Sequence, residues 1–490
     1  MLEGTLCDLR YQVRSSQPGE VSSDPDQLVE LIAQSIDRAL KAARKAKVEL
    51  LAVATSCYWH SLMGLDRNGR PTTELLTWAD TRSAQEGQRL RVASDESAYH
   101  ARTGCFFHAS YWPAKLRWLQ ATRPTIVRKT TRWVSFGEYL FEQFLGTSPV
   151  SISMASGTGL LDINRCEWDP SALGLVATEP IALSRLAEWD EALRGLRPRY
   201  RARWPQVADI PWYLPLGDGG LANIGSGAVT PRWWCATIGT SSAMRMVIAG
   251  DHLLIPWGAF AYRLDRRHFI VGGALSEGGN VVRWFSDALG LGKRKKLEQA
   301  AASIPPDSHG LTVLPFWAGE RSPNWRAEAR AVIAGLSLST LPAHLLRAAM
   351  EAITYQLAAV ADAMEAVAAK PQSVVATGGQ LTHSAFWSQM LADGLGVPVM
   401  MSRQPEASSR GAALMALHAL GRLPGLWSLT PGRGRSLRPR ADVHAAYQRG
   451  RLRQAQLYRA IFGTTGAGEL SAAPGLDSRK TDPQTPAARH

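Results

Sequence analysis

Cysteine is scarce in this sequence, and long apolar runs are missing. The 490 residues include 5 cysteines, which are widely spaced without a C-x-x-C pair, so neither a disulfide framework nor a zinc site is indicated. No uninterrupted apolar stretch approaches the ~18 residues that a membrane-spanning helix needs. The first residues show no basic segment followed by an apolar one. We therefore expect a cytoplasmic protein that makes no membrane contact.

Two common nucleotide-binding signatures are also absent. The chain contains neither G-x-x-x-x-G-K-[ST] nor G-x-G-x-x-G, which excludes an ordinary P-loop and a dinucleotide fingerprint. Basic residues give a net charge of +13, but they are scattered and are not interleaved with aromatic residues in a recognised module. Nucleic acid is therefore not expected as a partner. An anionic small substrate would suit the charge as well, although bulk charge alone does not decide this.

The length and the hydrophobic pattern predict a two-domain α/β protein. A chain of 490 residues exceeds the size at which one core keeps growing. Helical spacing, strand-like runs and turn residues predict these elements: a helix over 22–46, a buried strand over 48–56, a turn at 67–69, hairpins over 233–250 and 260–275, helices over 279–290, 341–369 and 406–421, and a strand, Gly-Gly turn and helix over 372–399. The stretch from 463 to 490 has no periodicity, and we expect a disordered tail there.

Four glycine-bearing turns are present, namely GDGG at 217–220, IGTSSA at 238–243, GGALSEGG at 272–279 and ATGGQ at 376–380. Glycine lets backbone N–H groups approach an anion closely, and the hydroxyls of Thr240 and Ser241 add donors. A single turn of this kind is more often only a turn. Four of them leave a nucleotide cleft built from several loops as an open interpretation.

One acid stands in the first of these turns. Phosphoryl transfer needs a carboxylate that orients the attacking hydroxyl and accepts its proton, and Asp218 is a candidate for it. The alternative is an aspartate that only forms a turn, which the spacing alone favours.

A second group of candidates lies in the first half of the chain. "CYWHSLMGLD" and "TWADTRS" contain Trp59, His60, Asp80 and Arg82, which offer polar groups for hydroxyls and an aromatic wall for a C–H face. The alternatives are packing for Trp59 and His60 and a simple ion pair for Asp80 with Arg82. Both interpretations stay open at this stage.

Taken in order, the motifs resemble those of the FGGY family of carbohydrate kinases. "WHSLMGLDRNGRP", "LLTWADTRS", "RTGCFFHASYWPAKLRWL", "GDGGLANIGSG", "IGTSSAMR", "GGALSEGG", "LPFWAGERSPNW", "ATGGQLTHSAFWSQMLADGLGVPV" and "EASSRGAALMAL" follow the family order. The resemblance implies a two-domain actin-like ATPase (ribonuclease H-like) α/β fold with a cleft between the domains. It places an N-terminal sugar-binding domain at 1–224 and a C-terminal nucleotide-binding domain at 225–450.

The resemblance also implies an activity and a site. The sugar segments are most similar to those of gluconokinases, which implies ATP- and Mg²⁺-dependent phosphorylation of D-gluconate to 6-phosphogluconate, with xylulose as an alternative substrate and a homodimer as an option. It assigns no metal-ligating residue. The implied roles are: general base, Asp218; substrate contacts, Trp59, His60, Asp80, Arg82 and Tyr111; phosphate contacts, Gly239, Thr240 and Ser241; nucleotide flanks, Gly278 and Gly379; adenosine contacts, Gln380 and His383.

The N-terminus departs from the family pattern. Family members begin with a strand, a D-x-G-T-[ST] phosphate loop and a second strand, whereas this chain begins at "EGTLCDLRYQV", where the third strand is expected. We therefore expect the first two strands to be missing through a misplaced start codon. The alternative is a truncated, non-catalytic homologue that binds the sugar. Glu277 stands where family members often have a small or amide residue.

Overall fold

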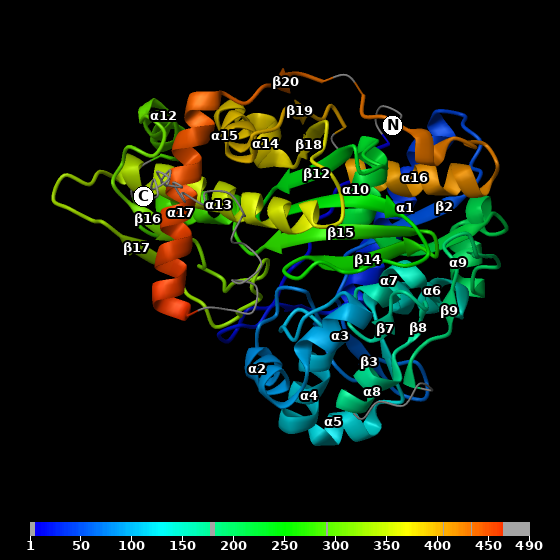
Figure 1. Ribbon diagram of the computed structural model, residues 1–490. Helices are drawn as coiled ribbons and strands as arrows, with labels where there is room; N and C mark the ends of the chain where they lie inside the picture. The colour runs from blue at the N-terminus through cyan, green and yellow to red at the C-terminus, as the bar shows by residue number, and fades with distance from the viewer. Residues whose placement is uncertain (1–4, 177–181, 291–292, 405, 433, 464–490) are drawn as a thin grey trace, which may run out of the picture.

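The computed structural model describes residues 5–176, 182–290, 293–404, 406–432 and 434–463. Figure 1 shows a large sheet, built mainly from the second half of the chain, above a smaller part in which blue and cyan helices surround short strands. The predicted disordered tail lies, apart from its first residue, outside the described residues.

The first half of the chain contains short strands and helices. The strands are β1 (Ser22–Ser23), β2 (Val53–Cys57), β3 (Met63–Leu65), β4 (Leu75–Leu76), β5 (Arg132–Val134), β6 (Val150–Ser151), β7 (Leu161–Asp162), β8 (Glu167–Trp168), β9 (Leu186–Ala187), β10 (Ala192–Leu193) and β11 (Trp212–Gly217). The helices are α1 (Pro25–Lys45), α2 (Ala84–Ala93), α3 (Glu96–Thr103), α4 (Trp112–Thr122), α5 (Pro124–Lys129), α6 (Phe136–Leu145), α7 (Ile152–Ser156), α8 (Pro170–Val176), α9 (Pro198–Arg203) and the 3₁₀ helix η2 (Pro205–Val207).

The second half has longer strands. They are β12 (Trp233–Ile238), β13 (Ser242–Ala249), β14 (Phe260–Asp265), β15 (His268–Leu275), β16 (Thr312–Leu314), β17 (Val332–Ala334), β18 (Ser373–Thr377), β19 (Val399–Met401) and β20 (Ser436–Leu437). The helices are α10 (Asp218–Ser226), α11 (Gly279–Asp287), α12 (Arg294–Ser303), α13 (Pro342–Glu365), α14 (Gly379–His383), α15 (Ala385–Leu395), α16 (Ala407–Ala419), α17 (Ala441–Phe462) and the 3₁₀ helix η3 (Leu426–Ser428).

The first predicted helix is confirmed as α1. The Asp24 side chain accepts hydrogen bonds from the backbone N–H groups of Asp26 and Gln27, which satisfies donors that a helix start leaves free. Pro25 occupies the first turn, where its missing N–H costs nothing. Leu28 and Ala33 are buried, so the apolar stripe packs inward as its spacing predicts.

Strands β2 and β11 determine where the first group of candidate residues lies. In the described chain the sheet has the order β10-β11-β2, and β11 runs parallel to β2 with Trp212 opposite Val53 and Gly217 opposite Cys57. Parallel strands end at the same edge of a sheet. The residues that follow Cys57 and Gly217 therefore meet.

Two expectations for the N-terminal strands are wrong. Residues 53–56 are only half-buried rather than buried, because β2 is an edge strand of its sheet in the described chain. Residues 5–13 form no strand, and the nearest pairing is a single bridge from Arg14 to Ser22. An extended segment becomes a strand only when a neighbouring strand accepts its backbone hydrogen bonds.

The larger sheet confirms the two predicted hairpins. Its order in the described chain is β14-β15-β13-β12-β18-β19-β20, with β12 antiparallel to β13 and β14 antiparallel to β15. β12 runs parallel to β18, with Thr237 opposite Thr377. The turns that follow β12 and β18 therefore lie together at one edge of the larger sheet. In the same way, the residues that follow β2 and β11 lie together at one edge of the smaller sheet.

Helices α10 and α16, which are far apart in the sequence, are in close backbone contact. A Cβ on Gly225 would lie 1.8 Å from the Ala407 carbonyl oxygen, and one on Gly411 would lie 2.0 Å from the Leu221 oxygen. Only glycine permits this approach. Because Asp218 begins α10, the helix pair also fixes the position of that acid.

Replacing Gly411 by alanine is expected to destabilise the fold, since the added methyl group would force the two helix backbones apart. A cost of about 2 kcal/mol is expected for overpacking of this kind, or a fall in melting temperature of about 4 to 8 °C for a domain of this size. Thermal unfolding followed by circular dichroism measures the change. Gly174→Ala is the matched control, because Gly174 is a helical glycine with nothing within 4 Å of an added Cβ; equal melting of both variants would contradict the packing argument.

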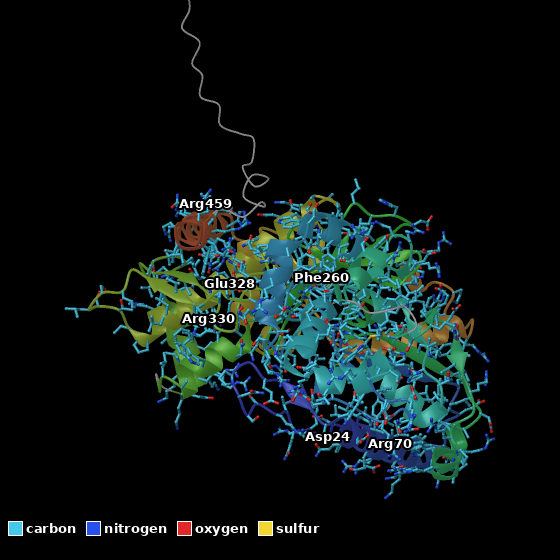
Figure 2. All side chains as sticks on the ribbon, turned by 90° about the horizontal axis from the view of Figure 1, so that it is seen from below. Asp24, Arg70, Phe260, Glu328, Arg330 and Arg459 are labelled. Carbon is cyan, nitrogen blue, oxygen red and sulfur yellow. The ribbon has the colours of Figure 1, made fainter. Side chains whose placement is uncertain are left out.

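Helix α17 was not among the predicted elements. Val443, Tyr447, Gly450, Gln454 and Tyr458 are buried, so a helical stripe is present, but only three of its members are apolar. Between them lie arginines that indicated only a solvated surface. Figure 2 places Arg459 of this helix on the same side of the molecule as Glu328 and Arg330 of the segment before β17.

Within the described part of the chain, no helix combines the length and the apolar character needed to cross a bilayer.

Candidate active site

Trp59 packs directly against the glycine turn that contains Asp218. It follows β2 by two residues, and a Cβ on Gly217 would lie 1.9 Å from its Cε2 atom. The indole N–H donates to the Ser153 carbonyl oxygen at 2.8 Å, which fixes the ring. The glycines at this turn therefore make room for an aromatic wall beside the acid.

The Asp218 carboxyl has only one of its two oxygens in a hydrogen bond with the described residues. Asp218 is the first residue of α10, and its Oδ1 accepts a hydrogen bond from Gly219 N–H at 2.8 Å. Its Oδ2 accepts no hydrogen bond from the described residues. Burial raises the pKa of the carboxyl above its ordinary value, and the charges of Arg245 and Arg321 oppose that rise. A carboxylate of raised pKa is a stronger base than an exposed one.

The predicted residues His60 and Tyr111 lie beside Trp59. The His60 and Tyr111 rings meet edge to face with centroids 5.0 Å apart, and Trp59 is 4.9 Å from the Tyr262 ring. His60 Nδ1 bonds the Gly157 carbonyl oxygen at 2.6 Å, and burial lowers the pKa of this histidine well below its ordinary value. It is therefore neutral at pH 7.

Tyr262, which was not predicted, completes this wall. Its hydroxyl bonds that of Tyr111 at 2.7 Å, although it belongs to β14 of the larger sheet. No local pattern marks Tyr262, because its partners in the wall are at least 151 residues away in the sequence. The wall is thus built from both halves of the chain.

Asp80 and Arg82 form an ion pair, as the simpler interpretation stated. Arg82 Nη2 lies 2.6 Å from Asp80 Oδ2, and the two side chains are only 5% and 3% exposed. Val21 N–H also donates to Asp80 Oδ2 at 3.1 Å, and Glu74 accepts from Arg82 Nη2 at 3.2 Å. Arg82 Nη1 is buried without a hydrogen-bond partner among the described residues, although it lies 3.7 Å from Glu20 Oε1. The contacts to substrate expected for both residues stay a prediction.

Lys115 ties the two substrate segments together. Its ammonium donates to the carbonyl oxygens of His60 at 2.7 Å and Thr77 at 2.8 Å. Burial lowers the pKa of Lys115 to about 7, and the nearby Asp80 carboxylate opposes that effect. The lysine therefore holds the residues after β2 against the segment that ends in Asp80.

The predicted nucleotide turns converge at the ends of β12 and β18. Gly279 N–H donates to the Gly239 oxygen at 2.7 Å and Asn280 N–H to the Thr240 oxygen at 3.2 Å. A Cβ on Gly278 would lie 2.9 Å from the Ser241 backbone. The turns around 239–241 and 278–279, which are distant in the sequence, are thus one unit.

The third turn adds Gly379, Gln380 and His383. Gln380 lies 2.7 Å from where a Cβ on Gly279 would stand, and it accepts a hydrogen bond from Arg294. His383 is exposed, and its Nδ1 bonds the Gly379 oxygen at 2.7 Å. The structure thus brings Gly379 and Gln380 to the converging turns and leaves His383 on the surface beside them.

Glu277 is a buried residue that bonds neighbouring segments of these turns through both its backbone and its side chain. Its backbone oxygen accepts from Ser242 Oγ at 2.6 Å, and its Oε1 accepts from Ala318 N–H at 3.0 Å. Burial raises the pKa of Glu277 to about 8, so its carboxyl is mostly protonated at pH 7.

Two arginines in the site were missed. Arg245 ends the "IGTSSAMR" motif, donates to Thr237 Oγ1 at 2.9 Å, and its charge acts on Asp218. Arg321 belongs to "LPFWAGERSPNW" and acts on the same carboxyl. The motifs containing them were recognised, but a sequence alone does not show which motif residues turn inward.

One cluster in the described residues has the composition of a metal site, namely Asp307, His309 and Glu351. His309 Nδ1 accepts from Leu311 N–H at 3.1 Å, and its Nε2 lies 3.0 Å from Glu351. Arg347 also pairs with the Glu351 carboxylate. Both imidazole nitrogens are thus used by the protein, so the cluster is a hydrogen-bonded network of the core.

Family comparison matches almost the whole described chain. Residues 7–225 match the description "FGGY family of carbohydrate kinases, N-terminal domain", and residues 235–420 match the C-terminal domain of the same family. Among curated proteins, a gluconokinase from Bacillus subtilis (strain 168) is 27% identical over 424 residues, covering 84% of this chain and 82% of that protein. A glycerol kinase from Aromatoleum aromaticum is 31% identical over 433 residues, covering 84% of each.

Solved structures share the fold. A ligand-bound xylulose kinase from Lactobacillus acidophilus has a TM-score of 0.85 at 25% identity, and a gluconate kinase from the same organism has 0.84 at 24% identity, each covering 93% of both chains. A Plasmodium falciparum glycerol kinase with ADP has a TM-score of 0.80 at 20% identity over 93% of both chains. The predicted two-domain actin-like architecture is therefore confirmed.

Proposed function

The chain belongs to the FGGY family of carbohydrate kinases, and from this premise we propose that it transfers the terminal phosphoryl group of ATP to D-gluconate, giving 6-phosphogluconate. The observation that supports the proposal is the position of Asp218, whose glycine turn packs against Trp59 and whose carboxyl lies near Arg245, the last residue of the "IGTSSAMR" motif. The similarity to gluconokinases at 27% identity supports gluconate as the substrate.

The glycine turns fit a nucleotide. A Cβ on Gly239 would meet nothing within 4 Å, and one on Gly379 would meet only His383 at 3.9 Å, so both backbones border open space. Thr240, the residue after Gly239, is exposed. Backbone N–H groups and a hydroxyl at the ends of strands are suited to phosphate oxygens. We assign Gly239, Thr240 and Ser241 to the phosphates, Gly278 and Gly379 to the flanks, and Gln380 and His383 to the adenosine side.

Asp218 acts as the general base. When bound, ATP supplies the transferable phosphoryl group and Mg²⁺ neutralises its oxygens. The free Oδ2 of Asp218 would accept the proton of the substrate hydroxyl as the hydroxyl oxygen bonds to the terminal phosphorus of ATP, while the bond from that phosphorus to the bridging oxygen breaks and ADP leaves. Arg245, 2.9 Å from Thr237 Oγ1, holds positive charge near the acid, which lowers the pKa of Asp218 and so favours the ionised form that a base needs.

The sugar lies against Trp59, His60 and Tyr111. The Trp59 ring offers a flat apolar face for C–H groups, and the neutral His60 can exchange hydrogen bonds with hydroxyls. Asp80 and Arg82 are also assigned to the substrate, with Arg82 Nη1, which has no hydrogen-bond partner among the described residues, as the donor for a hydroxyl. Mg²⁺, a cytoplasmic location and a homodimer are further proposals that rest on the family alone.

A coupled assay of ADP release tests the proposal on the full chain. We expect turnover with D-gluconate to exceed turnover with D-xylulose and glycerol. Faster turnover of xylulose would reassign the substrate and keep the kinase. Folded protein that turns over none of the three contradicts the proposal, and gluconate binding by calorimetry without ADP formation would favour a non-catalytic protein.

The pH dependence of kcat/KM should show an acid limb that belongs to Asp218. The base acts only when deprotonated, and burial raises its pKa, so activity is expected to fall as pH drops through a value above the ordinary ~3.9 of aspartate. Arg245 opposes that rise, so Arg245→Gln should move the limb to higher pH. A pH–rate profile from pH 4 to 9 measures both effects. An Arg245→Gln limb at unchanged or lower pH would contradict this account.

A further inference from the structure

A buried guanidinium, that of Arg321, lies beside the aromatic wall without a role in the mechanism above. It follows β16, is 8% exposed, and its Cζ lies 5.4 Å from the Trp78 ring centre and 5.7 Å from that of Trp325. Its charge lowers the pKa of both His60 and His108. The guanidinium is thus close enough to act on the residues expected to hold the sugar.

Among the described residues, Arg321 differs from Arg263 and Arg347 in having no hydrogen-bond or ion-pair partner for its side chain. Arg263 donates to carbonyl oxygens such as that of Ile163 at 2.6 Å, and Arg347 pairs with Glu351. The Nε of Arg321 is buried without a hydrogen-bond partner. Within the described residues, no carboxylate oxygen lies within the 4.0 Å of an ion pair from any of its nitrogens.

The neighbouring acids are used elsewhere, and the Asp218 carboxylate, on which the Arg321 charge acts, is the base of the mechanism above. Glu320 accepts hydrogen bonds from Tyr458 and Asn324, each at 2.7 Å, and Glu277 accepts from Ala318 N–H. Lys115 and Arg245 add positive charge to the same region. A buried cation without a counterion is costly, so the site lacks one anionic group that its ligand can supply.

We infer that Arg321 binds the carboxylate of the substrate, and that it thereby selects aldonates over neutral sugars and polyols. The inference rests on the proposed function and adds to it the residue that recognises the acid group. Arginine suits this task because its planar donors match the two oxygens of a carboxylate. A phosphate oxygen of the nucleotide is the other anion that this guanidinium could meet, and the tests below separate the two.

The first test changes only the ligand. Isothermal titration of the wild-type full chain with D-gluconate and with D-gluconamide, both without nucleotide, compares an anion with a neutral ligand of the same shape. A charge-assisted pair of this kind is expected to weaken gluconamide binding by about 10- to 150-fold. Equal affinities would overturn the inference, whatever any variant does.

The second test changes the arginine. Arg321→Met is expected to raise KM for gluconate by about 10- to 150-fold and to raise KM for D-xylulose much less, because xylulose has no carboxylate to lose this contact; any change in kcat through Asp218 should be shared by both substrates. The KM of Arg321→Lys for gluconate should lie between that of the wild type and that of Arg321→Met, since lysine keeps the charge and loses the planar donors. Arg330→Met is the matched control, because Arg330 is an exposed arginine. Figure 2 shows it on the same side of the molecule as Arg459 of helix α17.

The outcomes separate the carboxylate from the phosphate and from a failed function. An equal loss of kcat on gluconate and xylulose in Arg321→Met, without a larger rise in KM for gluconate, would assign the guanidinium to the phosphoryl group and overturn the inference. Wild-type gluconate kinetics in that variant would overturn it while leaving the kinase intact. Absence of any sugar-dependent ADP formation by the wild type would contradict the proposed function itself, and the nucleotide-free titration would still decide the role of Arg321.

Discussion

Replacing Asp218 by asparagine is expected to lower kcat on D-gluconate by about 10²- to 10⁴-fold with little change in KM. The amide has the shape of the carboxylate and can still accept the Gly219 N–H bond through its oxygen, but it cannot take a proton from the substrate hydroxyl. The start of α10 should therefore stay in place while the base is lost. Initial rates of ADP release against gluconate concentration measure both constants.

Asp190→Asn is the matched control for this variant, because Asp190 is an exposed aspartate of the same half of the chain. It should show wild-type kinetics. Wild-type kcat in a folded Asp218→Asn protein would show that the carboxylate only forms a turn, which is the alternative that its spacing favours.

Replacing Arg82 by methionine is expected to destabilise the protein by about 3 to 5 kcal/mol. The change leaves the buried Asp80 carboxylate, 3% exposed, without its cation and removes a partner of Glu74. A fall in melting temperature of about 6 °C or more follows for a domain of this size. Thermal unfolding measures this effect, and gluconate KM measured well below the transition reports any separate contact with substrate.

The surface pair of Arg165 with Glu167 provides the control, since these side chains are 72% and 63% exposed. Exposed pairs contribute about 0 to 1 kcal/mol, so Arg165→Met should melt like the wild type. An Arg82→Met protein that melts normally but has a raised KM would make Arg82 a substrate contact rather than the structural partner of Asp80.

Local patterns predicted the elements that carry the site. Helix α1, the hairpins β12–β13 and β14–β15, and the strand, turn and helix from β18 onward follow from apolar spacing and glycine turns. The same patterns marked the turns after β12 and β18, whose convergence depends on parallel pairing of Thr237 with Thr377. A short-range signal was sufficient wherever a turn follows directly on a strand.

What the sequence could not show depends on contacts between distant segments. The Tyr262 hydroxyl bonds that of Tyr111, which is 151 positions away in the sequence. Arg321, whose charge acts on His60, belongs to a segment much later in the chain, after strand β16. Strand β2 has the composition of a buried strand and lies at an edge, because burial depends on how many strands flank it. In α17, polar Gln454 and small Gly450 interrupt the apolar stripe, so its helical period was not recognised.

The central claim is that this chain transfers phosphate to the terminal hydroxyl of gluconate. Proton-coupled ³¹P NMR of a reaction of the full chain with ATP, Mg²⁺ and D-gluconate tests it most directly. We expect a new phosphomonoester signal split by the two protons of the terminal CH₂ group, formed in proportion to ADP. Inorganic phosphate as the only new signal, or no new signal from folded protein, would contradict the claim.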